Sequence, residues 1–315
     1  MIKKDSKIYV AGHSGLIGSA IVKKLINDGY TQILTVSHSD LDLNNASAVS
    51  QYFKEKQPEY VILAAGIVGG IAANINYPAT FILKNLAIQL NVFQAALDIS
   101  VRKLLFYGSS CMYPLDSAQP MPESSLLTGK PEPSSLFYAI AKLAGIGMCQ
   151  AINRQHKTTS FLSLIPNNVY GPNDNFNQNL SHVLPALISK FHNAKKENCS
   201  QVKLWGTGSA KREFVFSEDL AEISIELISR DINAESFPMN ISRGEEVSIS
   251  ELASIIADVV GYQGHIVWDD TKPIGAQRKL LDPTNLRNHG LFPKTELKAG
   301  ITATYDWYIN NSPST

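Results

Sequence analysis

The sequence has few cysteines, no excess of charge of either sign and no long uncharged apolar run. Its three cysteines, Cys111, Cys149 and Cys199, have neither CxxC spacing nor a neighbouring pair of histidines, so we expect no disulfide framework and no metal site. Lys plus Arg and Asp plus Glu both number 28, which gives no electrostatic reason to expect nucleic acid or an anionic membrane as a partner. The longest uncharged apolar stretch, Val61 to Ala73, is too short to cross a bilayer, and the N-terminus has no secretory apolar region. The expected location is the cytoplasm.

The length of 315 residues is enough for about two structural units. Up to residue 165, short apolar runs alternate with helical stretches, which predicts an α/β fold built on a doubly wound parallel sheet. After Pro166 the alternation stops, and we expect 166–315 to be mainly a smaller, mixed α/β substrate domain, with a segment near 214–243 returning to domain 1–165. Ser248 and Glu251 predict a capping box, Gly261 a helix end and Asp219 a helix cap. The expected strands of the first domain are 7–11, 33–37, 60–65, 104–108 and 161–165.

Three glycines, Gly12, Gly15 and Gly18, follow the first expected strand and open a helix. Glycine permits a tight turn, and the helix N-terminus favours a pyrophosphate, so this spacing predicts dinucleotide binding. The segment after the second strand normally distinguishes NAD from NADP through an acid or a basic residue. Residues 35–39 contain neither, and His38 carries positive charge only when protonated. The residues expected at the cofactor are Gly12, Ser14, Gly15, Leu16, Ile17, Gly18 and His38.

Tyr138 and Lys142 are spaced i, i+4 on an expected helix over 135–155 and so share one face. We expect the ammonium to lower the pKa of the Tyr138 phenol, so that it exchanges a proton near neutral pH. Without further evidence, two ordinary surface residues are a simpler interpretation of this tyrosine and lysine than a catalytic pair. Ser109 favours catalysis, because it follows a strand at its carboxyl end, where doubly wound sheets bind ligands.

Together these features resemble the extended short-chain dehydrogenase/reductase family, whose fold is Rossmann-type. Within it, the chain is similar over nearly its whole length to GDP-L-fucose synthases, which are GDP-4-keto-6-deoxy-D-mannose 3,5-epimerase-4-reductases. The similar blocks are AGHSGLIGSAI at 11–21, VGGIAANINYPATFI at 68–82, KLLFYGSSCMYP at 103–114, YAIAKLAGI from 138, NNVYGPNDNF from 167, SHVLPALI from 181, WGTGSAKREF from 205 and RKLLD from 278.

The resemblance implies an NADP(H)-dependent enzyme that acts on a GDP-4-keto-6-deoxy sugar. Cys111 and His182 would epimerise C3 and C5, with the assignment of base and acid left open. Tyr138, Lys142 and Ser109 would then assist hydride reduction at C4. Without the resemblance, Cys111 would be interpreted as a small buried hydrophobe and His182 as a polar residue at a helix start. The resemblance also implies a homodimer through helices that flank the sheet, cofactor contacts from Lys142, Asn168 and His182, and GDP-sugar contacts from Lys190, Trp205, Arg212 and Lys279.

Several positions depart from this family. Ser14 and His38 lie where NADPH-dependent members commonly carry arginine, so we expect only a modest preference for NADPH over NADH. Ile67 and Ile274 replace a lysine and an acid, which leaves the sugar open: a GDP-colitose synthase and a GDP-6-deoxy-heptose C4 reductase are alternatives. Ser110 and Cys111 replace the Asp-Glu pair of 4,6-dehydratases. A non-catalytic NADP-sensing protein is the alternative from another class, and it would need none of Ser109, Tyr138 and Lys142.

Overall fold

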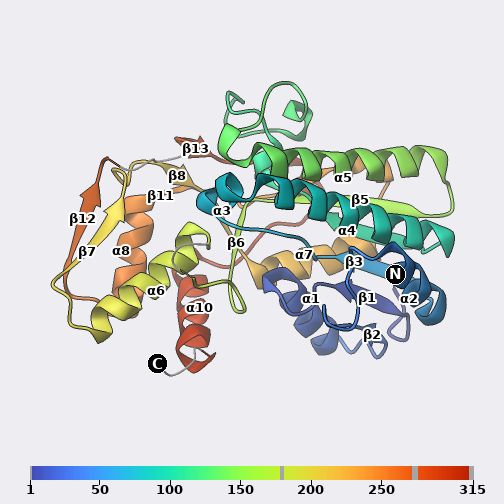
Figure 1. Ribbon diagram of the computed structural model, residues 1–315, viewed down its shortest axis with the longest axis horizontal. Helices are drawn as coiled ribbons and strands as arrows, with labels where there is room; N and C mark the ends of the chain where they lie inside the picture. The colour runs from blue at the N-terminus through green and yellow to red at the C-terminus, as the bar shows by residue number, and fades with distance from the viewer. Residues whose placement is uncertain (1, 178–180, 272–275, 312–315) are drawn as a thin grey trace.

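Six parallel strands form the central sheet of the computed structural model, which describes residues 2–177, 181–271 and 276–311. Ile274 therefore lies outside the described residues. The strand order is β10-β5-β4-β3-β1-β2. The strands are β1 (Ile8–Ala11), β2 (Ile33–Leu34), β3 (Tyr60–Leu63), β4 (Lys103–Tyr107), β5 (Ser160–Pro166) and β10 (Met239–Ile241). Helices cover both faces of the sheet, which confirms the predicted doubly wound α/β fold (Figure 1).

The two faces of the sheet bury two separate cores, as the alternation of side chains along β1 illustrates. Ile8 and Val10 pack with α1 (Leu16–Asn27) and α7 (Ser217–Ser229) on one face. Tyr9 and Ala11 belong to the core on the other face, which is covered by α2 (Ala46–Lys56), α4 (Pro78–Asp98) and α5 (Leu136–Gln155). β1 and its neighbour β3 are therefore buried on both sides, as is typical of an all-parallel sheet, whereas the edge strand β2 is half-buried.

The second strand is shorter than predicted. The apolar run suggested a strand over 33–37, but β2 ends at Leu34. The chain turns at Ser37, whose carbonyl accepts hydrogen bonds from the backbone N–H groups of Asp40 and Leu41. The Ser37 hydroxyl also binds the Asp40 carboxylate at 2.6 Å. A turn of this kind cannot continue a ladder, so the segment that follows β2 is a loop.

The C-terminal lobe lies at one end of the molecule, beyond the sheet (Figure 1). Its core is formed mainly by α6 (Val183–Lys196), α8 (Ile249–Val260) and α10 (Leu297–Asn311), with the parallel pair β7 (Gln201–Trp205) and β12 (His265–Asp269) beside them. Short strands connect this lobe to the sheet: β6 (Asn168–Tyr170) with β9 (Phe214–Phe216), and β11 (Val247–Ser248) with β8 (Lys211–Arg212) and β13 (Arg278–Lys279). The remaining helices are α3 (Ile71–Asn76), α9 (Thr284–Asn288) and the 3₁₀ turns η1 (Ser110–Met112), η2 (Glu123–Ser125), η3 (Pro133–Ser135) and η4 (Ala234–Ser236).

The sixth strand comes from late in the sequence. β10 pairs in parallel with β5, with Met239 opposite Leu164. The segment expected to return to the first domain, 214–243, carries β9, α7 and β10. The division into 1–165 and 166–315 stays a prediction.

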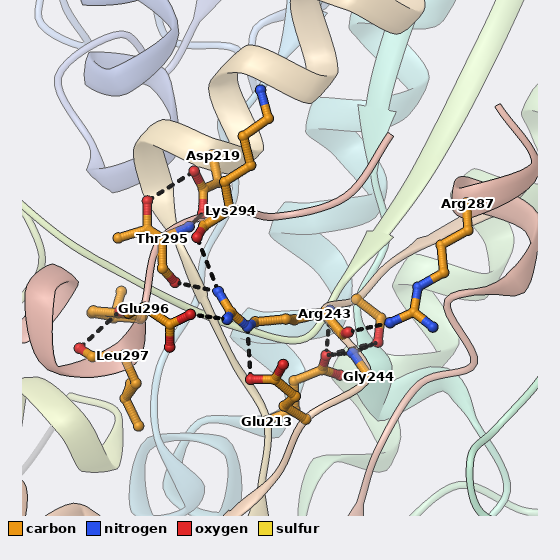
Figure 2. Close-up of polar contacts among 12 residues, drawn as sticks. Glu213, Asp219, Arg243, Gly244, Arg287, Lys294, Thr295, Glu296 and Leu297 are labelled. Atoms are coloured by element: carbon orange, nitrogen blue, oxygen red, sulfur yellow. Dashed lines mark hydrogen bonds and ion pairs between the residues drawn. The ribbon is translucent and has the colours of Figure 1, made fainter. Parts of the chain in front are cut away.

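Helix ends agree with the predicted capping at two positions and differ at one. Ser248 and Glu251 form the capping box of α8, and Gly261 ends that helix with φ of +75°. Asp219 is not a cap, because Phe216 occupies the N-cap of α7. The Asp219 carboxylate instead accepts hydrogen bonds from the Thr295 backbone N–H and hydroxyl, at 2.8 and 2.9 Å (Figure 2). It therefore ties α7 to the segment before α10.

One helical segment, 133–155, is long and apolar enough to cross a membrane by length and composition. The sequence analysis had singled out only 61–73. In the fold this segment packs against α4 and β5 and buries Ala139, Ala141 and Ile146. Its apolar character is accounted for by its place in the core.

Candidate active site

The glycine turn lies between β1 and α1 at the carboxyl edge of the sheet. Gly12 has φ of +82°, and a Cβ on Gly18 would lie 2.1 Å from the Gly12 carbonyl oxygen, so only glycine fits at both positions. Gly15 is the N-cap of α1 and makes no side-chain cap hydrogen bond. The first N–H groups of the helix are therefore available to an anion, and the turn fits a pyrophosphate. Ser14 lies within this turn and is exposed, and Leu16 and Ile17 are the first residues of α1.

His38 lies in the loop after β2, and its side chain is 83% exposed. Its Nδ1 is 4.0 Å from an Asp42 carboxylate oxygen. Hydrogen bonds from Asn44 lower the pKa of Asp42, which keeps this carboxylate ionised. A carboxylate thus lies next to the predicted 2′-phosphate residue, and its negative charge opposes a phosphate there.

Ser109 and Tyr138 meet at the carboxyl end of β4. Ser109 follows the strand and caps η1, and its hydroxyl accepts a hydrogen bond from the Cys111 backbone N–H at 3.3 Å. The Ser109 side chain lies close enough to the Tyr138 phenol to act on its pKa, which it lowers. The Tyr138 ring packs edge-on against Phe81 of α4, with ring centroids 6.0 Å apart. The structure thus brings together the serine and tyrosine that the sequence predicted as a pair.

Lys142 lies one turn after Tyr138 on α5 and is 5% exposed. Its ammonium donates a hydrogen bond to the Tyr107 carbonyl at 2.9 Å and lies 5.8 Å from the centre of the Tyr138 ring. Burial lowers the pKa of Lys142 to about 8. Burial also raises the pKa of Tyr138, with Cys111 adding to this and Ser109 opposing it. The expectation that Lys142 lowers the pKa of Tyr138 is therefore wrong, because desolvation of the phenol outweighs an ammonium that is bonded elsewhere.

Cys111 lies in η1, beside a cation from the far end of the sequence. The Lys279 ammonium on β13 is 3.7 Å from the Cys111 sulfur and 4.0 Å from a carboxylate oxygen of Glu132. The pairing of β13 with β8 sets Lys279 opposite Arg212. Burial lowers the pKa of Arg212, while Glu132 and Cys111 act in the opposite direction. Four groups from four segments therefore form one charged cluster.

His182 is the N-cap residue of α6. Burial lowers the pKa of His182, and the Lys279 ammonium lowers it further. The imidazole is therefore mainly neutral at neutral pH. This electrostatic interaction links the predicted second proton-transfer residue to the cluster that contains Cys111.

Lys190 and Trp205 both lie at β7: Lys190 bonds to this strand from α6, and Trp205 is its last residue. The Lys190 ammonium on α6 donates a hydrogen bond to the Lys203 carbonyl at 2.5 Å, and burial lowers the pKa of Lys190. Trp205 ends the strand and is 64% exposed. A large aromatic face open to solvent fits stacking with a base.

Asn168 is bonded within the polypeptide. Its amide donates to the Glu213 carbonyl at 2.8 Å and to the Asn167 side-chain oxygen at 3.1 Å. It thereby fixes β6 beside β9, which also pair through the register of Asn168 with Phe214. The predicted cofactor contact of Asn168 stays a prediction.

Glu213 is a fully buried carboxylate that the sequence analysis quoted only within a similar block. It accepts hydrogen bonds from the side chains of Asn167 and Ser242 at 3.0 and 2.7 Å. The backbone N–H groups of Arg243, Gly244 and Leu281 also donate to it. Burial raises the pKa of Glu213, and these hydrogen bonds oppose the rise. One side chain thus joins the segments that carry Arg212, Asn168 and Lys279.

Arg243 extends this network toward α10 (Figure 2). Its guanidinium donates to the Lys294 and Thr295 carbonyls at 3.1 and 2.9 Å and pairs with Glu296. Arg287 in turn donates to the Arg243 carbonyl at 2.8 Å. These contacts hold the chain at Arg243, next to Glu213, against the segment that leads into α10.

Sequence reasoning missed Glu132 as well as Glu213. Glu132 lies between Pro131 and Pro133, in a stretch without periodic pattern, and it reaches Lys279 only through the tertiary fold. The available signal was chemical: a carboxylate flanked by prolines in a segment that leads directly into the Tyr138 helix.

Comparison with known proteins agrees with this geometry. Residues 8–241 match the NAD dependent epimerase/dehydratase family. GDP-L-fucose synthase 1 of Arabidopsis thaliana is 50% identical over 99% of this chain and 95% of its own length. GDP-L-fucose synthase of Escherichia coli is 43% identical over 97% of both chains. Among solved structures, a GDP-mannoheptose C4 reductase from Campylobacter jejuni with NADP bound has a TM-score of 0.89 and 36% identity, covering 98% of this chain and 100% of the other. The chain thus belongs to the NAD-dependent epimerase/dehydratase family, among its GDP-sugar epimerases and reductases.

Proposed function

We propose that the protein converts GDP-4-keto-6-deoxy-D-mannose to GDP-L-fucose, by epimerisation at C3 and C5 followed by NADPH-dependent reduction at C4. One observation carries the proposal: Ser109 and Cys111 both act on the Tyr138 phenol, and Cys111 also contacts the Lys279 ammonium at 3.7 Å. This places a reductase's proton donor beside a thiol with an adjacent cation. The relatives that are 50% and 43% identical over nearly the whole chain carry the same activity in their names.

The cofactor would be held by the turn of Gly12, Gly15 and Gly18. Gly12 has positive φ, and a Cβ on Gly18 would meet the Gly12 carbonyl, so side chains do not fit at these two positions. NADPH bound there supplies the hydride that reduces C4. The related reductase of known structure carries NADP. Ser14 can donate a neutral hydrogen bond to the 2′-phosphate, and His38 can add charge when protonated. The ratio of kcat/KM for NADPH to that for NADH measures whether this preference is modest.

Epimerisation requires two side chains that exchange protons with carbon. The C4 ketone acidifies the protons on C3 and C5. At each carbon, a base removes the proton from one face and an acid delivers a different proton to the opposite face of the enolate. Cys111 and His182 supply these roles. Both lie in the electrostatic field of Lys279, whose ammonium also suits the developing enolate oxygen.

Reduction requires a proton for the C4 oxygen. Tyr138 supplies it from a phenol that burial keeps protonated, while Ser109 holds the oxygen in place through a second hydrogen bond. Lys142 stabilises the phenolate that remains. Arg212 and Lys190 would bind the diphosphate, and Trp205 would stack on the guanine.

The decisive experiment is NMR of the product formed from GDP-4-keto-6-deoxy-D-mannose and NADPH in deuterated water. We expect GDP-L-fucose with deuterium at C3 and C5. Cys111→Ser and His182→Asn should each bind NADPH but lose deuterium incorporation, because serine is a far weaker base and asparagine cannot recover a proton. Cys199→Ser is the matched control, since this exposed cysteine lies in the other lobe. Normal product from both site variants would make these two residues structural.

The second candidate is a C4 reductase for another GDP-4-keto sugar, favoured by the likeness to the GDP-mannoheptose C4 reductase. A GDP-colitose synthase from Yersinia pseudotuberculosis, 39% identical over 96% of this chain, represents the sugar epimerised at one carbon only. The same NMR spectra distinguish these alternatives. A C4 reductase would incorporate deuterium at neither C3 nor C5, and a GDP-colitose synthase would incorporate it at one carbon.

We further propose that the enzyme is a cytoplasmic homodimer. Apolar side chains remain exposed along the outer surfaces of two sheet-flanking helices. Leu83 and Leu90 on α4 are 65% and 58% exposed, and Phe137 and Ile140 on α5 add to the same side of the sheet. A second copy of this surface would cover it in an isologous contact.

A further inference from the structure

We propose that Glu132 is a positioning residue for the epimerisation: it holds Lys279 with its ammonium against the sulfur of Cys111 and so maintains the reactive thiolate. The inference rests on the proposed function, because it assigns Cys111 a proton-transfer role. Glu132 is paired with the Lys279 ammonium, and it is this ammonium that contacts the sulfur, so Glu132 acts through Lys279.

The Lys279 ammonium contacts both the Cys111 sulfur and the Glu132 carboxylate. Lys279 Nζ lies 3.7 Å from Cys111 Sγ and 4.0 Å from Glu132 Oε2. The Lys279 and Glu132 side chains are only 16% and 19% exposed, so solvent screens their interaction less than at the surface. A lysine has four rotatable bonds, and one contact to a thiol does not fix them. A second contact, to the Glu132 carboxylate, restricts the ammonium to this position.

Glu132 is itself held in place. Its other carboxylate oxygen accepts a hydrogen bond from the Ser134 hydroxyl at 2.6 Å. The flanking residues Pro131 and Pro133 restrict its backbone. η3 and α5 follow directly, so the segment that orients Glu132 also carries Tyr138. The carboxylate therefore has a fixed direction before any substrate binds.

The charged groups around the sulfur give this arrangement a testable sign. The Lys279 ammonium and the Arg212 guanidinium are the cations that act on this sulfur, and the Tyr138 phenol beside it is neutral. The field of Glu132 alone would disfavour a second anion nearby. Its hold on Lys279 has the opposite effect, because it keeps a cation in direct contact with the sulfur. Removing the carboxylate therefore separates the two contributions.

The test is the pH dependence of iodoacetamide alkylation at Cys111, in a Cys199→Ser background. Cys149 is buried, and peptide mass analysis assigns the modified residue. We expect Glu132→Gln to lower the alkylation rate at pH 7 about tenfold and to move the midpoint of the profile up by about one pH unit. Lys279→Met should do at least as much, and Glu132→Asp should restore part of the rate. An unchanged or lower midpoint in Glu132→Gln would overturn the proposal, since a direct field effect gives that result.

Controls separate position from folding and from the proposed function. Glu123→Gln removes a carboxylate of the preceding η2 turn, which accepts from the Asn240 backbone N–H, and should leave the profile unchanged. If Glu132→Gln does not fold, Ser134→Ala gives a smaller shift in the same direction, and no shift there would overturn the proposal. Alkylation needs no substrate, so it tests Glu132 even if wild type fails to exchange deuterium with the GDP-sugar, which would refute the proposed function alone. In the exchange assay, Glu132→Gln should lower kcat about tenfold with little change in KM.

Discussion

Burial determines how the two principal side chains of the reductive step hold their protons. The Tyr138 phenol, with its raised pKa, stays protonated throughout the physiological range and loses its proton only when an alkoxide develops beside it. The Lys142 ammonium has a pKa of about 8 and therefore titrates close to cellular pH. The proton donor is thus insensitive to pH, while the group that stabilises its conjugate base is sensitive.

Replacing Tyr138 by phenylalanine should separate the two half-reactions. The hydroxyl is needed only when charge develops on the C4 oxygen, so we expect reduction to fall by about 10²–10⁴-fold while deuterium exchange continues. NADPH absorbance and deuterium incorporation measure the two steps. Tyr107→Phe is the matched control, since this buried phenol donates to Ser224 on the other face of the sheet and should not affect chemistry. Near-normal NADPH turnover in the Tyr138 variant would remove this residue from the mechanism.

The low pKa of Lys142 predicts a pH limit. Below about pH 8 the amine is charged and stabilises the Tyr138 phenolate; above it the amine becomes neutral. Single-turnover reduction should therefore decline as pH rises through about 8, by up to tenfold per unit. Lys142→Arg keeps its charge at all these pH values, so its rate should be lower but flat. A wild-type rate that is constant to pH 9.5 contradicts this prediction.

Among the structural elements, the glycine turn and the buried carboxylate of Glu213 do most to shape the site. The turn brings α1 against the end of β1, and Glu213 joins segments that are far apart in sequence. In both cases the surroundings leave no freedom to the backbone, so the site is formed before any ligand arrives.

Two alanine substitutions in the turn should have different effects. A Cβ on Gly18 would lie 2.1 Å from the Gly12 carbonyl oxygen, so Gly18→Ala should lower Tm and abolish NADPH binding. A Cβ on Gly15 would lie at an ordinary 3.6 Å from the same atom, so Gly15→Ala should keep its Tm. Any loss of NADPH affinity in Gly15→Ala then reports contact with the cofactor itself. Scanning fluorimetry and fluorescence titration measure both; a normal Tm for Gly18→Ala would show that the turn can relax.

Glu213→Ala should destabilise the fold strongly. The substitution removes the shared acceptor of five buried or part-buried hydrogen bonds, and we expect a loss of about 2–5 kcal/mol in the free energy of unfolding. Glu245→Gln is the control, because this side chain is 66% exposed and forms a surface ion pair with Arg243 that contributes about 0–1 kcal/mol. Urea titration gives both values. Equal losses in the two variants would mean that the buried network adds nothing.

Features that depend on residues close together in the sequence were mostly predictable, whereas features that depend on distant residues were mostly not. The capping box of Ser248 and Glu251 was predictable because both partners lie within one turn. The strand over 33–37 and the cap at Asp219 were wrong, since a turn at Ser37 and a contact with Thr295 decide them. The Ser109–Tyr138 pair was accessible through the topology of the sheet. Glu132 and Glu213 were not, because their partners lie more than 100 residues away or come from several segments at once.

For the molecule as a whole, the exposed apolar surface of α4 and α5 predicts a dimer that one charge can disrupt. Leu90→Glu would place a carboxylate in the proposed contact, so we expect light scattering to show a shift from two chains to one. Ile309 on α10 is 47% exposed but lies in the other lobe. The control variant Ile309→Glu should therefore remain a dimer. A wild-type mass of a single chain at micromolar concentration would refute the dimer.

The position of β10 in the sheet has a consequence for synthesis on the ribosome. β5 can pair with β4 as soon as residue 166 has left the ribosome. Its other neighbour, β10, ends at Ile241, about 75 residues later. At roughly 5–20 residues per second, the edge of β5 waits for about 4–15 s without its partner. During that interval its free N–H and C=O groups can pair with any other nascent strand. Rare codons or pauses between residues 166 and 241 would lengthen this exposure, so the yield of folded enzyme depends on how quickly the substrate-binding half is translated.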